Sequence, residues 1–220
     1  MVNYKTVPVA DVYKQDRLAG HLARDSDTVT FTYNPSYPLE DAQVANTLPV
    51  GRPVTATGGA VPAFFAGLLP EGLRLTALTA ATKTSADDML TLLLAVGGDT
   101  IGDVRVAPIG EPLPPADTVT ATHAGESFTS MFAAAIGTTP DTVALPGVQE
   151  KMSGEMVSAH VSDRGIPAIV KLDPPGRDRM VANEHFFLQF AAACGIDVPE
   201  HDLRTDTNAQ HALFVRRFDR

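Results

Sequence analysis

A short run of prolines divides this 220-residue chain into two parts. Residues 111–116 have the sequence Glu-Pro-Leu-Pro-Pro-Ala, and the prolines stiffen this segment into an extended spacer with no packing role. We therefore predict a first domain at residues 1–110, a linker at 111–122 and a second domain at 123–220.

The overall composition is that of a globular protein large enough to bury a core. Hydrophobic residues make up 44% of the chain and charged residues 20%. The longest apolar stretch, near residues 90–96, has the length of a core helix rather than of a membrane span. The N-terminus has no charged region followed by an apolar run, so we expect no secretion. These features predict a cytoplasmic protein of bacterial type that does not enter the membrane.

The net negative charge argues against binding to nucleic acid. The formal net charge is −9, and no cluster of lysine and arginine provides the basic face that duplex DNA requires. We therefore expect no direct contact with nucleic acid. An acidic surface would instead favour a basic partner protein.

Cysteine and histidine usage gives no sign of a metal site. Cys194 is the only cysteine, which excludes an internal disulfide and a zinc site with several thiolates. It follows alanines at a predicted helix end, so we expect it to be buried as a small apolar side chain. The six histidines show no pair four residues apart, and we expect no zinc.

The first domain begins with a pattern typical of β-strands. Apolar and polar side chains alternate over residues 3–33, with breaks at Asp16-Arg17, at Gly20 and at residues 25–27. Alternation with a period of two, interrupted by polar breaks, predicts antiparallel strands joined by tight turns. The prolines within residues 34–38 end this meander.

Helices are predicted next. Residues 62–82 have apolar side chains at helical spacing, but Pro70 should split them into two short helices. A further helix should begin near Ser85, with acidic residues in its first turn, and end at Gly97-Gly98. We expect the leucines at 68–78 and 90–94 to be core residues. A strand is predicted at residues 101–109.

The second domain alternates loop, strands and helix in a definite order. We predict a short helix, a glycine-containing loop, two paired strands, the best helix of the chain and two further strands. These elements occupy residues 126–136, 145–151, 156–161, 168–172, 181–194, 203–205 and 212–218, respectively.

Three positions in the second domain follow the order of a protein-kinase N-lobe. A kinase grips the nucleotide phosphates with a backbone-rich loop, places a lysine on a neighbouring strand and holds that lysine with a helix carboxylate. Gly147, Lys171 and Glu184 are the candidates. Each also has an ordinary explanation: a turn glycine, a lysine at a strand end, and an acid that the helix dipole favours.

Several motifs resemble those of the HipA family of toxin kinases. Pro-Gly-Val-Gln-Glu-Lys resembles its glycine loop, Ile-Val-Lys-Leu its nucleotide-lysine strand, and Val-Arg-Arg-Phe-Asp-Arg its hinge. Two segments of the first domain are typical of the family's N-terminal module. The matching segments are 64–72, 97–104, 146–151, 169–172, 183–199 and 215–220. The resemblance covers essentially the whole chain.

The resemblance implies a fold and a set of site residues. The fold is α+β: an N-terminal antiparallel β module with two or three helices, then an N-lobe-like antiparallel sheet with one main helix. Lys171 contacts the nucleotide phosphates, and Glu184 pairs with or positions it. Arg216 and Phe218 offer backbone groups to adenine, and Asp219 reaches the ribose. The loop over the phosphates is formed by Gly147, Val148, Gln149, Glu150 and Lys151.

The chain departs from the family pattern at three places. Members often carry a phosphorylated serine at the loop, where this chain has Ala144 and Pro146, and Arg216 stands where glutamate is usual. The catalytic aspartate, the asparagine and the magnesium-binding aspartate follow the hinge in the family, beyond Arg220. We therefore expect no catalytic residue and no magnesium ligand here, although ATP and magnesium are expected for the full-length family. By itself the chain should be an inactive kinase that binds ATP weakly.

Three interpretations of the chain remain open at this point. The chain is either the ATP-binding N-terminal portion of a HipA-like serine/threonine kinase, as a fragment, truncated gene or half of a split system, or a non-catalytic module that docks onto a separate kinase or antitoxin. An unrelated α+β protein with chance motifs is the third reading. The family resemblance implies a HipB-like DNA-binding antitoxin as partner and an aminoacyl-tRNA synthetase as the protein substrate.

Overall fold

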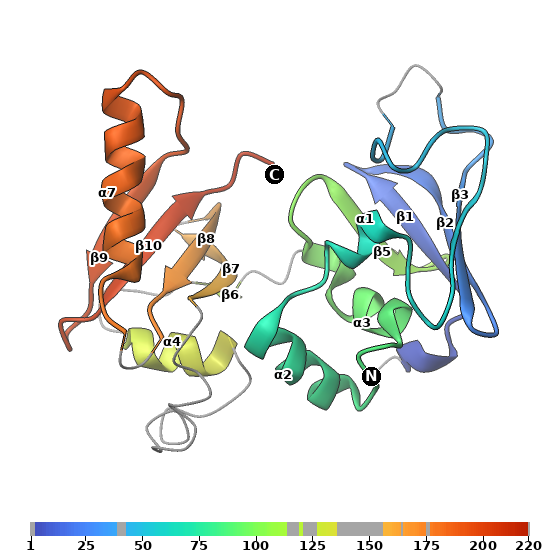
Figure 1. Cartoon of the computed structure of the whole chain (residues 1–220), viewed down its shortest axis with the longest axis horizontal. Helices are drawn as coiled ribbons and strands as arrows, with labels where there is room; N and C mark the ends of the chain where they lie inside the picture. The colour runs from blue at the N-terminus through green and yellow to red at the C-terminus, as the bar shows by residue number, and fades with distance from the viewer. Residues whose placement is uncertain are drawn as a thin grey trace. The chain divides into compact units, whose positions relative to one another are not determined.

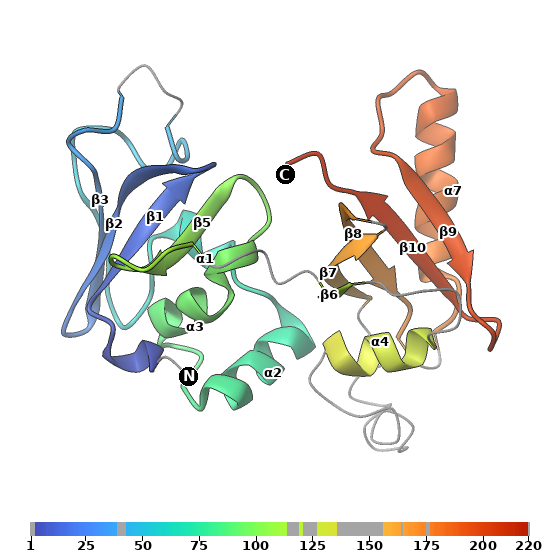
Figure 2. The ribbon, with the colours of Figure 1, turned by 180° about the vertical axis from the view of Figure 1, so that it is seen from behind.

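The computed structural model divides the chain into two compact units (Figures 1 and 2). One consists mainly of residues up to 117, and the other mainly of residues 118–218. The structure describes residues 3–38, 43–113, 119–120, 127–135, 156–163, 165–174 and 177–219. Among these residues, no helix combines the length and the apolarity needed to cross a membrane.

The first unit is built on a five-stranded antiparallel sheet. Its strand order is β4-β3-β2-β1-β5. The strands are β1 (Val9–Lys14), β2 (Arg17–Asp25), β3 (Thr28–Tyr33), β4 (Val54–Ala56) and β5 (Val104–Pro108). The predicted meander and the strand within residues 101–109 are confirmed, whereas β4 was not predicted.

One face of this sheet carries the core of the first unit. Val12, Leu22 and Phe31 alternate with polar neighbours along β1, β2 and β3, and each is at most 1% exposed. Phe31 also packs against Phe65, with ring centroids 5.2 Å apart. The period-two pattern of the sequence therefore corresponds to a buried face and a polar face.

Gly20 does not break the sheet, contrary to the sequence-based prediction. It lies inside β2, where it pairs with Val12 on one side and Tyr33 on the other. A Cβ at Gly20 would collide with the carbonyl oxygen of Thr32 and would lie 2.8 Å from the Phe31 ring. The glycine is present because the Phe31 ring and the β3 backbone leave no room for a side chain.

The helices of the first unit follow the predicted division at Pro70. They are η1 (Tyr4–Thr6), α1 (Ala63–Ala66), α2 (Gly72–Thr82), α3 (Met89–Val96) and η2 (Gly97–Asp99). Helix α3 begins later than predicted, because Asp88 rather than Ser85 is its N-cap and accepts a hydrogen bond from the Thr91 N–H.

The two leucine stripes differ in burial. Leu90, Leu92, Leu93 and Leu94 of α3 are all at most 4% exposed, so the prediction that they belong to the core is confirmed. Helix α2 has no fully buried residue, and its leucines are only partly covered. Leu68 and Leu69, just before α2, do pack against the core of the first unit, so the core prediction for residues 68–78 is met only in part.

The second unit contains another five-stranded sheet, in the order β6-β7-β8-β10-β9. The short β6 pairs parallel to β7, and all other neighbours are antiparallel. The elements are β6 (Val119–Thr120), α4 (Phe128–Ala135), β7 (Val157–Asp163), β8 (Ile166–Leu172), α7 (Met180–Ala193), β9 (His201–Thr205) and β10 (His211–Arg216). The α+β fold class is confirmed, and β6 lies within the segment expected to be linker.

The two faces of the second sheet have different roles. Val170 and Leu172 of β8 point to the face where α4 packs, in a core that includes Phe132 and Phe214. Because successive side chains of a strand point to opposite faces, Lys171 points to the other face, where α7 lies. One side of the sheet therefore packs against α4 in an apolar core, and the other side carries Lys171 towards α7.

Replacing Gly20 with alanine should lower the free energy of unfolding by about 1–3 kcal/mol, because the new methyl group must displace backbone and the Phe31 ring. Urea denaturation measures this loss. Gly67→Ala is the matched control, because its φ is −68° and the added methyl group would lie 3.4 Å from its nearest neighbour. Equal destabilisation by the two substitutions would contradict the steric explanation.

Candidate functional site

An ion pair joins β8 to α7. The Nζ atom of Lys171 lies 2.5 Å from Oε1 of Glu184, and the two side chains are 25% and 28% exposed. The structure thus brings together the lysine and the carboxylate that the sequence predicted to meet. Because such a partly exposed pair contributes only about 0–1 kcal/mol, it does not account for the attachment of α7 to the sheet.

Apolar packing provides that attachment. Val181 of α7 is fully buried, and so is Leu213 of β10, which lies directly opposite Lys171 in the sheet. Full burial of side chains of this size contributes about 1.5–3 kcal/mol each. The charged pair therefore lies on a surface that packing has already fixed.

The carboxylate of Asp173 fixes where α7 begins. Its Oδ2 atom accepts a hydrogen bond from the Arg179 N–H at 2.8 Å, and Oδ1 accepts one from the Val181 N–H at 2.9 Å. These N–H groups have no partner within the helix, so Asp173 acts as a cap supplied from the end of β8. It links the strand that carries Lys171 to the helix that carries Glu184.

Two histidines lie between α7 and β9. The ring centroids of His185 and His201 are 5.1 Å apart in an edge-to-face arrangement. His201 Nδ1 is 2.8 Å from the Pro199 carbonyl oxygen. His185 Nδ1 is buried without a hydrogen-bond partner among the described atoms. This contact adds a second point at which the rotation of α7 is fixed.

The predicted hinge residues follow directly from β10. The Arg216 N–H donates to the Glu200 carbonyl at 2.8 Å, and its guanidinium lies 3.0 Å from the Glu200 carboxylate. The backbone donor of Arg216 is therefore already in use. Phe218 is 91% exposed, and Asp219 is the last described residue. The predicted loop residues 147–151 lie outside the described residues.

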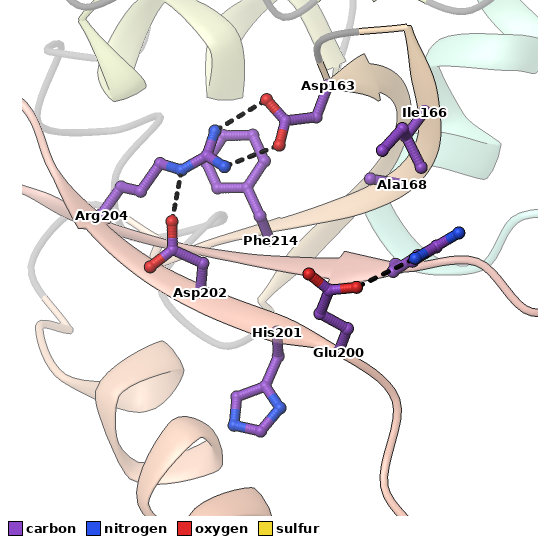
Figure 3. A pocket seen from close by; sticks show the side chains of 9 residues that line it. Asp163, Ile166, Ala168, Glu200, His201, Asp202, Arg204 and Phe214 are labelled. Atoms are coloured by element: carbon purple, nitrogen blue, oxygen red, sulfur yellow. Dashed lines mark hydrogen bonds and ion pairs between the residues drawn. The ribbon is translucent and has the colours of Figure 1, made fainter.

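A second feature of this sheet was not predicted. A cavity of about 330 Å³ opens on the face opposite Lys171, and Figure 3 shows its lining. It is lined by Asp163, Ile166, Ala168, Glu200, His201, Asp202, Arg204, Phe214 and Arg216.

Arg204 is the centre of this cavity wall. Its guanidinium donates two hydrogen bonds to Asp163, at 2.9 and 2.6 Å, and one to Asp202 at 2.8 Å. It also lies 4.1 Å above the Phe214 ring (Figure 3). The hydrogen bonds to Asp163 raise the pKa of Arg204 above its ordinary value.

The charges lining the cavity are already paired with one another. Asp163 and Asp202 bind Arg204, and Glu200 binds Arg216. A site whose polar groups are mutually satisfied offers a ligand little that it does not already have, so we assign this cavity a structural role. Its residues come from four strands, β7, β8, β9 and β10, and from Glu200 just before β9, and no local sequence motif indicated them.

Cys194 lies at the end of α7 and is exposed, so the prediction that it is buried is wrong. It is on the side of the helix that faces away from the sheet. Among the described residues, no group of three or more histidine, cysteine, aspartate or glutamate side chains could hold a metal ion.

Two family models match the chain. One, described as the HipA N-terminal domain, matches residues 10–107, and the other, described as the HipA-like C-terminal domain, matches residues 143–220. Together they account for most of the sequence.

Individual relatives agree with these matches. A curated protein of Sinorhizobium fredii named "Putative kinase Y4mE" is 27% identical, with 98% of this chain and 55% of that protein aligned. A chain from the solved Shewanella oneidensis MR-1 complex of HipA, HipB and operator DNA is 21% identical with a TM-score of 0.67, covering 96% of this chain and 51% of that one. This structural likeness shows the fold. The chain spans about half the length of each of these proteins.

Replacing Asp173 with alanine should lower the free energy of unfolding by about 0.5–2 kcal/mol, because two N–H groups at the start of α7 lose their acceptor. Chemical denaturation followed by circular dichroism measures the loss. Asp178→Ala removes the same charge from an exposed position nearby and should have a smaller effect. A larger effect at residue 178 would contradict the capping role.

Replacing Asp163 with alanine should also destabilise the second unit, by about 1–3 kcal/mol, because the partly buried Arg204 loses two charged hydrogen bonds. Asp202→Ala is the comparison, since it removes one bond from a carboxylate that is 62% exposed. Thermal denaturation should rank the two variants in that order. The reverse order would show that Asp163 is not the main partner of Arg204.

Proposed function

The chain belongs to the HipA family, and from this premise we propose that its second unit is the nucleotide-binding lobe of a HipA-like serine/threonine kinase. The family is one of toxin–antitoxin kinases. Within that family, we propose that these 220 residues include the part of the enzyme that binds ATP.

The observation that carries this proposal is the ion pair between Lys171 and Glu184. In protein kinases, a strand lysine meets the nucleotide phosphates, and a helix glutamate holds this lysine in place. The order strand, helix, two strands and hinge is also present here, with β8, α7, β9 and β10. A flexible lysine that is already oriented loses less conformational entropy when it binds an anion.

The roles of the other site residues follow from the same comparison with a protein-kinase N-lobe. We propose that Lys171 contacts the phosphates and that residues 147–151 cover them with backbone N–H groups. Because the Arg216 N–H is used within the sheet, Phe218 is the better candidate for a backbone contact with adenine. Asp219 would bind the ribose hydroxyl groups.

Magnesium is not assigned to any described residue. ATP binds to kinases with magnesium, which neutralises phosphate charge. Among the residues that the structure describes, no cluster of acidic side chains is suited to hold it. The carboxylate of Glu184 is engaged with Lys171, so in this proposal it positions the lysine rather than binding metal.

A DNA-binding partner is also proposed. The solved Shewanella HipA is described together with HipB and operator DNA. The net charge of −9 argues against direct DNA contact by this chain, so a HipB-like antitoxin would make that contact. The protein substrate stays a prediction from the family resemblance, with an aminoacyl-tRNA synthetase as the candidate.

Nuclear magnetic resonance titration of the chain with ATP tests the proposal. Amide signals of Lys171, Glu184 and Phe218 should shift together. Lys171→Met should weaken binding about tenfold, which corresponds to ~1.4 kcal/mol for the lost charge contact.

The matched control is Arg52→Met, which removes one positive charge from an exposed position in the first unit. It should leave ATP affinity unchanged. If Lys171→Met binds ATP as tightly as the unmodified chain does, or if the shifted signals lie in the first unit, the nucleotide-lobe assignment is wrong.

A further inference from the structure

The second unit includes three residues from earlier in the chain, Gly72–Arg74, which form the first turn of α2. Leu73 packs against the apolar core that the second sheet shares with α4. The guanidinium of Arg74 donates a hydrogen bond to the carbonyl oxygen of Ser158 in β7 at 2.6 Å, and this contact is partly buried. A charged donor makes a shorter and stronger hydrogen bond than a neutral one. The two side chains therefore attach this turn to the second sheet in different ways, one by apolar packing and one by a directed bond.

The Ser158 carbonyl points away from β8. The Arg217 N–H donates to the Pro167 carbonyl oxygen at 3.0 Å, so the odd-numbered residues of β8 direct their backbone groups to β10. Backbone groups alternate between the two neighbours of an antiparallel strand, so the even-numbered residues of β8 bond to β7. Because Leu172 lies opposite Val157, the odd-numbered residues of β7 take part in those bonds, and the backbone groups of Ser158 face the other edge of β7.

That edge of β7 is only partly covered by a neighbouring strand. The short β6 pairs with β7 at Val161 and Ser162. Among the described strands, none therefore pairs with Ser158 on this side, and its carbonyl accepts a hydrogen bond from a side chain instead. A strand edge without such a bond opens more readily, because its backbone groups exchange partners with water.

The start of β7 is connected to two parts of the proposed nucleotide site. Ser158 lies directly opposite Lys171 in the pairing of β7 with β8. The strand also follows residues 147–151 in the chain, which the proposed function places over the phosphates. A displacement of the β7 backbone at Ser158 would therefore act on the lysine through the sheet and on the loop through the chain.

We propose that Arg74 is a positioning residue of the nucleotide site, an inference that rests on the proposed function. Arg74 holds the backbone of β7 at Ser158, and β7 in turn holds the segment of β8 from which Lys171 reaches Glu184. In this role Arg74 acts through the strand and makes no contact with ATP.

Titration of the full chain with ATP, followed by nuclear magnetic resonance, tests this role. Arg74→Met removes the hydrogen bond and keeps a long side chain. ATP should bind to this variant about threefold more weakly than to the unmodified chain, a smaller loss than for Lys171→Met, because the effect is transmitted through β7. Arg74→Lys keeps a charged N–H donor and should recover part of the affinity. No recovery would overturn the proposal.

Leu73→Ala is the matched control from the adjacent position. It removes apolar packing from the same turn, so it should lower the midpoint of thermal denaturation. At a temperature where the chain is folded, it should leave the affinity for ATP unchanged. If Leu73→Ala weakens ATP binding as much as Arg74→Met does, general loosening of the turn explains both effects and the positioning role is wrong.

A spectroscopic signature separates positioning from stability. Without ATP, Arg74→Met should shift the carbonyl carbon signal of Ser158 and the amide signal of Lys171, because the lost bond changes the strand opposite the lysine. Both signals should return towards their original positions in Arg74→Lys. An unchanged Lys171 signal in Arg74→Met would show that the bond does not act on the lysine, and it would overturn the proposal.

Failure of this inference and failure of the proposed function give different results. If the unmodified chain binds ATP with a shift at Lys171, and Arg74→Met binds it equally tightly, only the role of Arg74 is wrong. If the unmodified chain does not bind ATP at Lys171, the nucleotide-lobe assignment is wrong and the role of Arg74 is overturned with it.

Discussion

The carboxylate of Asp173 holds the end of β8 and the start of α7 in a fixed relation, and the candidate site depends on that relation. A strand and a helix that follow each other in sequence can pack in many rotations. Capping by Asp173 sets the first turn of the helix, and the packing of Val181 sets which side faces the sheet. Glu184 then reaches Lys171 without the ion pair having to provide the stability itself.

The two faces of the second sheet have different roles. One face packs into a core that stabilises the unit, and the other carries the candidate site residues. On one face, Val170, Leu172 and Phe214 form a core with α4, and Arg204 is hydrogen-bonded to the carboxylates of Asp163 and Asp202. On the other face, a lysine and a glutamate remain partly accessible beneath a helix whose outer side is apolar. Such a division suits a binding site, because a group that binds ligand must be held in place by residues that do not.

Local patterns predicted much of the fold. Alternation along β1 to β3 identified the meander, and Pro70 separated α1 from α2, because both signals act within a few residues. The order of Lys171 and Glu184 predicted their meeting. Gly20 was misread as a break, since the need for a glycine arises from Phe31 and Thr32 on the neighbouring strand. Cys194 was misread as buried, since helical periodicity alone does not say which side of α7 faces the sheet.

The sequence by itself determined the α+β class, the positions of most elements and the candidate lysine and glutamate, because hydrophobic period, proline and glycine act locally. Only the tertiary structure decided that Asp173 caps a helix six residues away, that Arg204 binds Asp163, and that the phenylalanines of α7 face outward. These contacts join residues from different strands and helices. Their geometry depends on how the elements pack, which no local pattern of residues specifies.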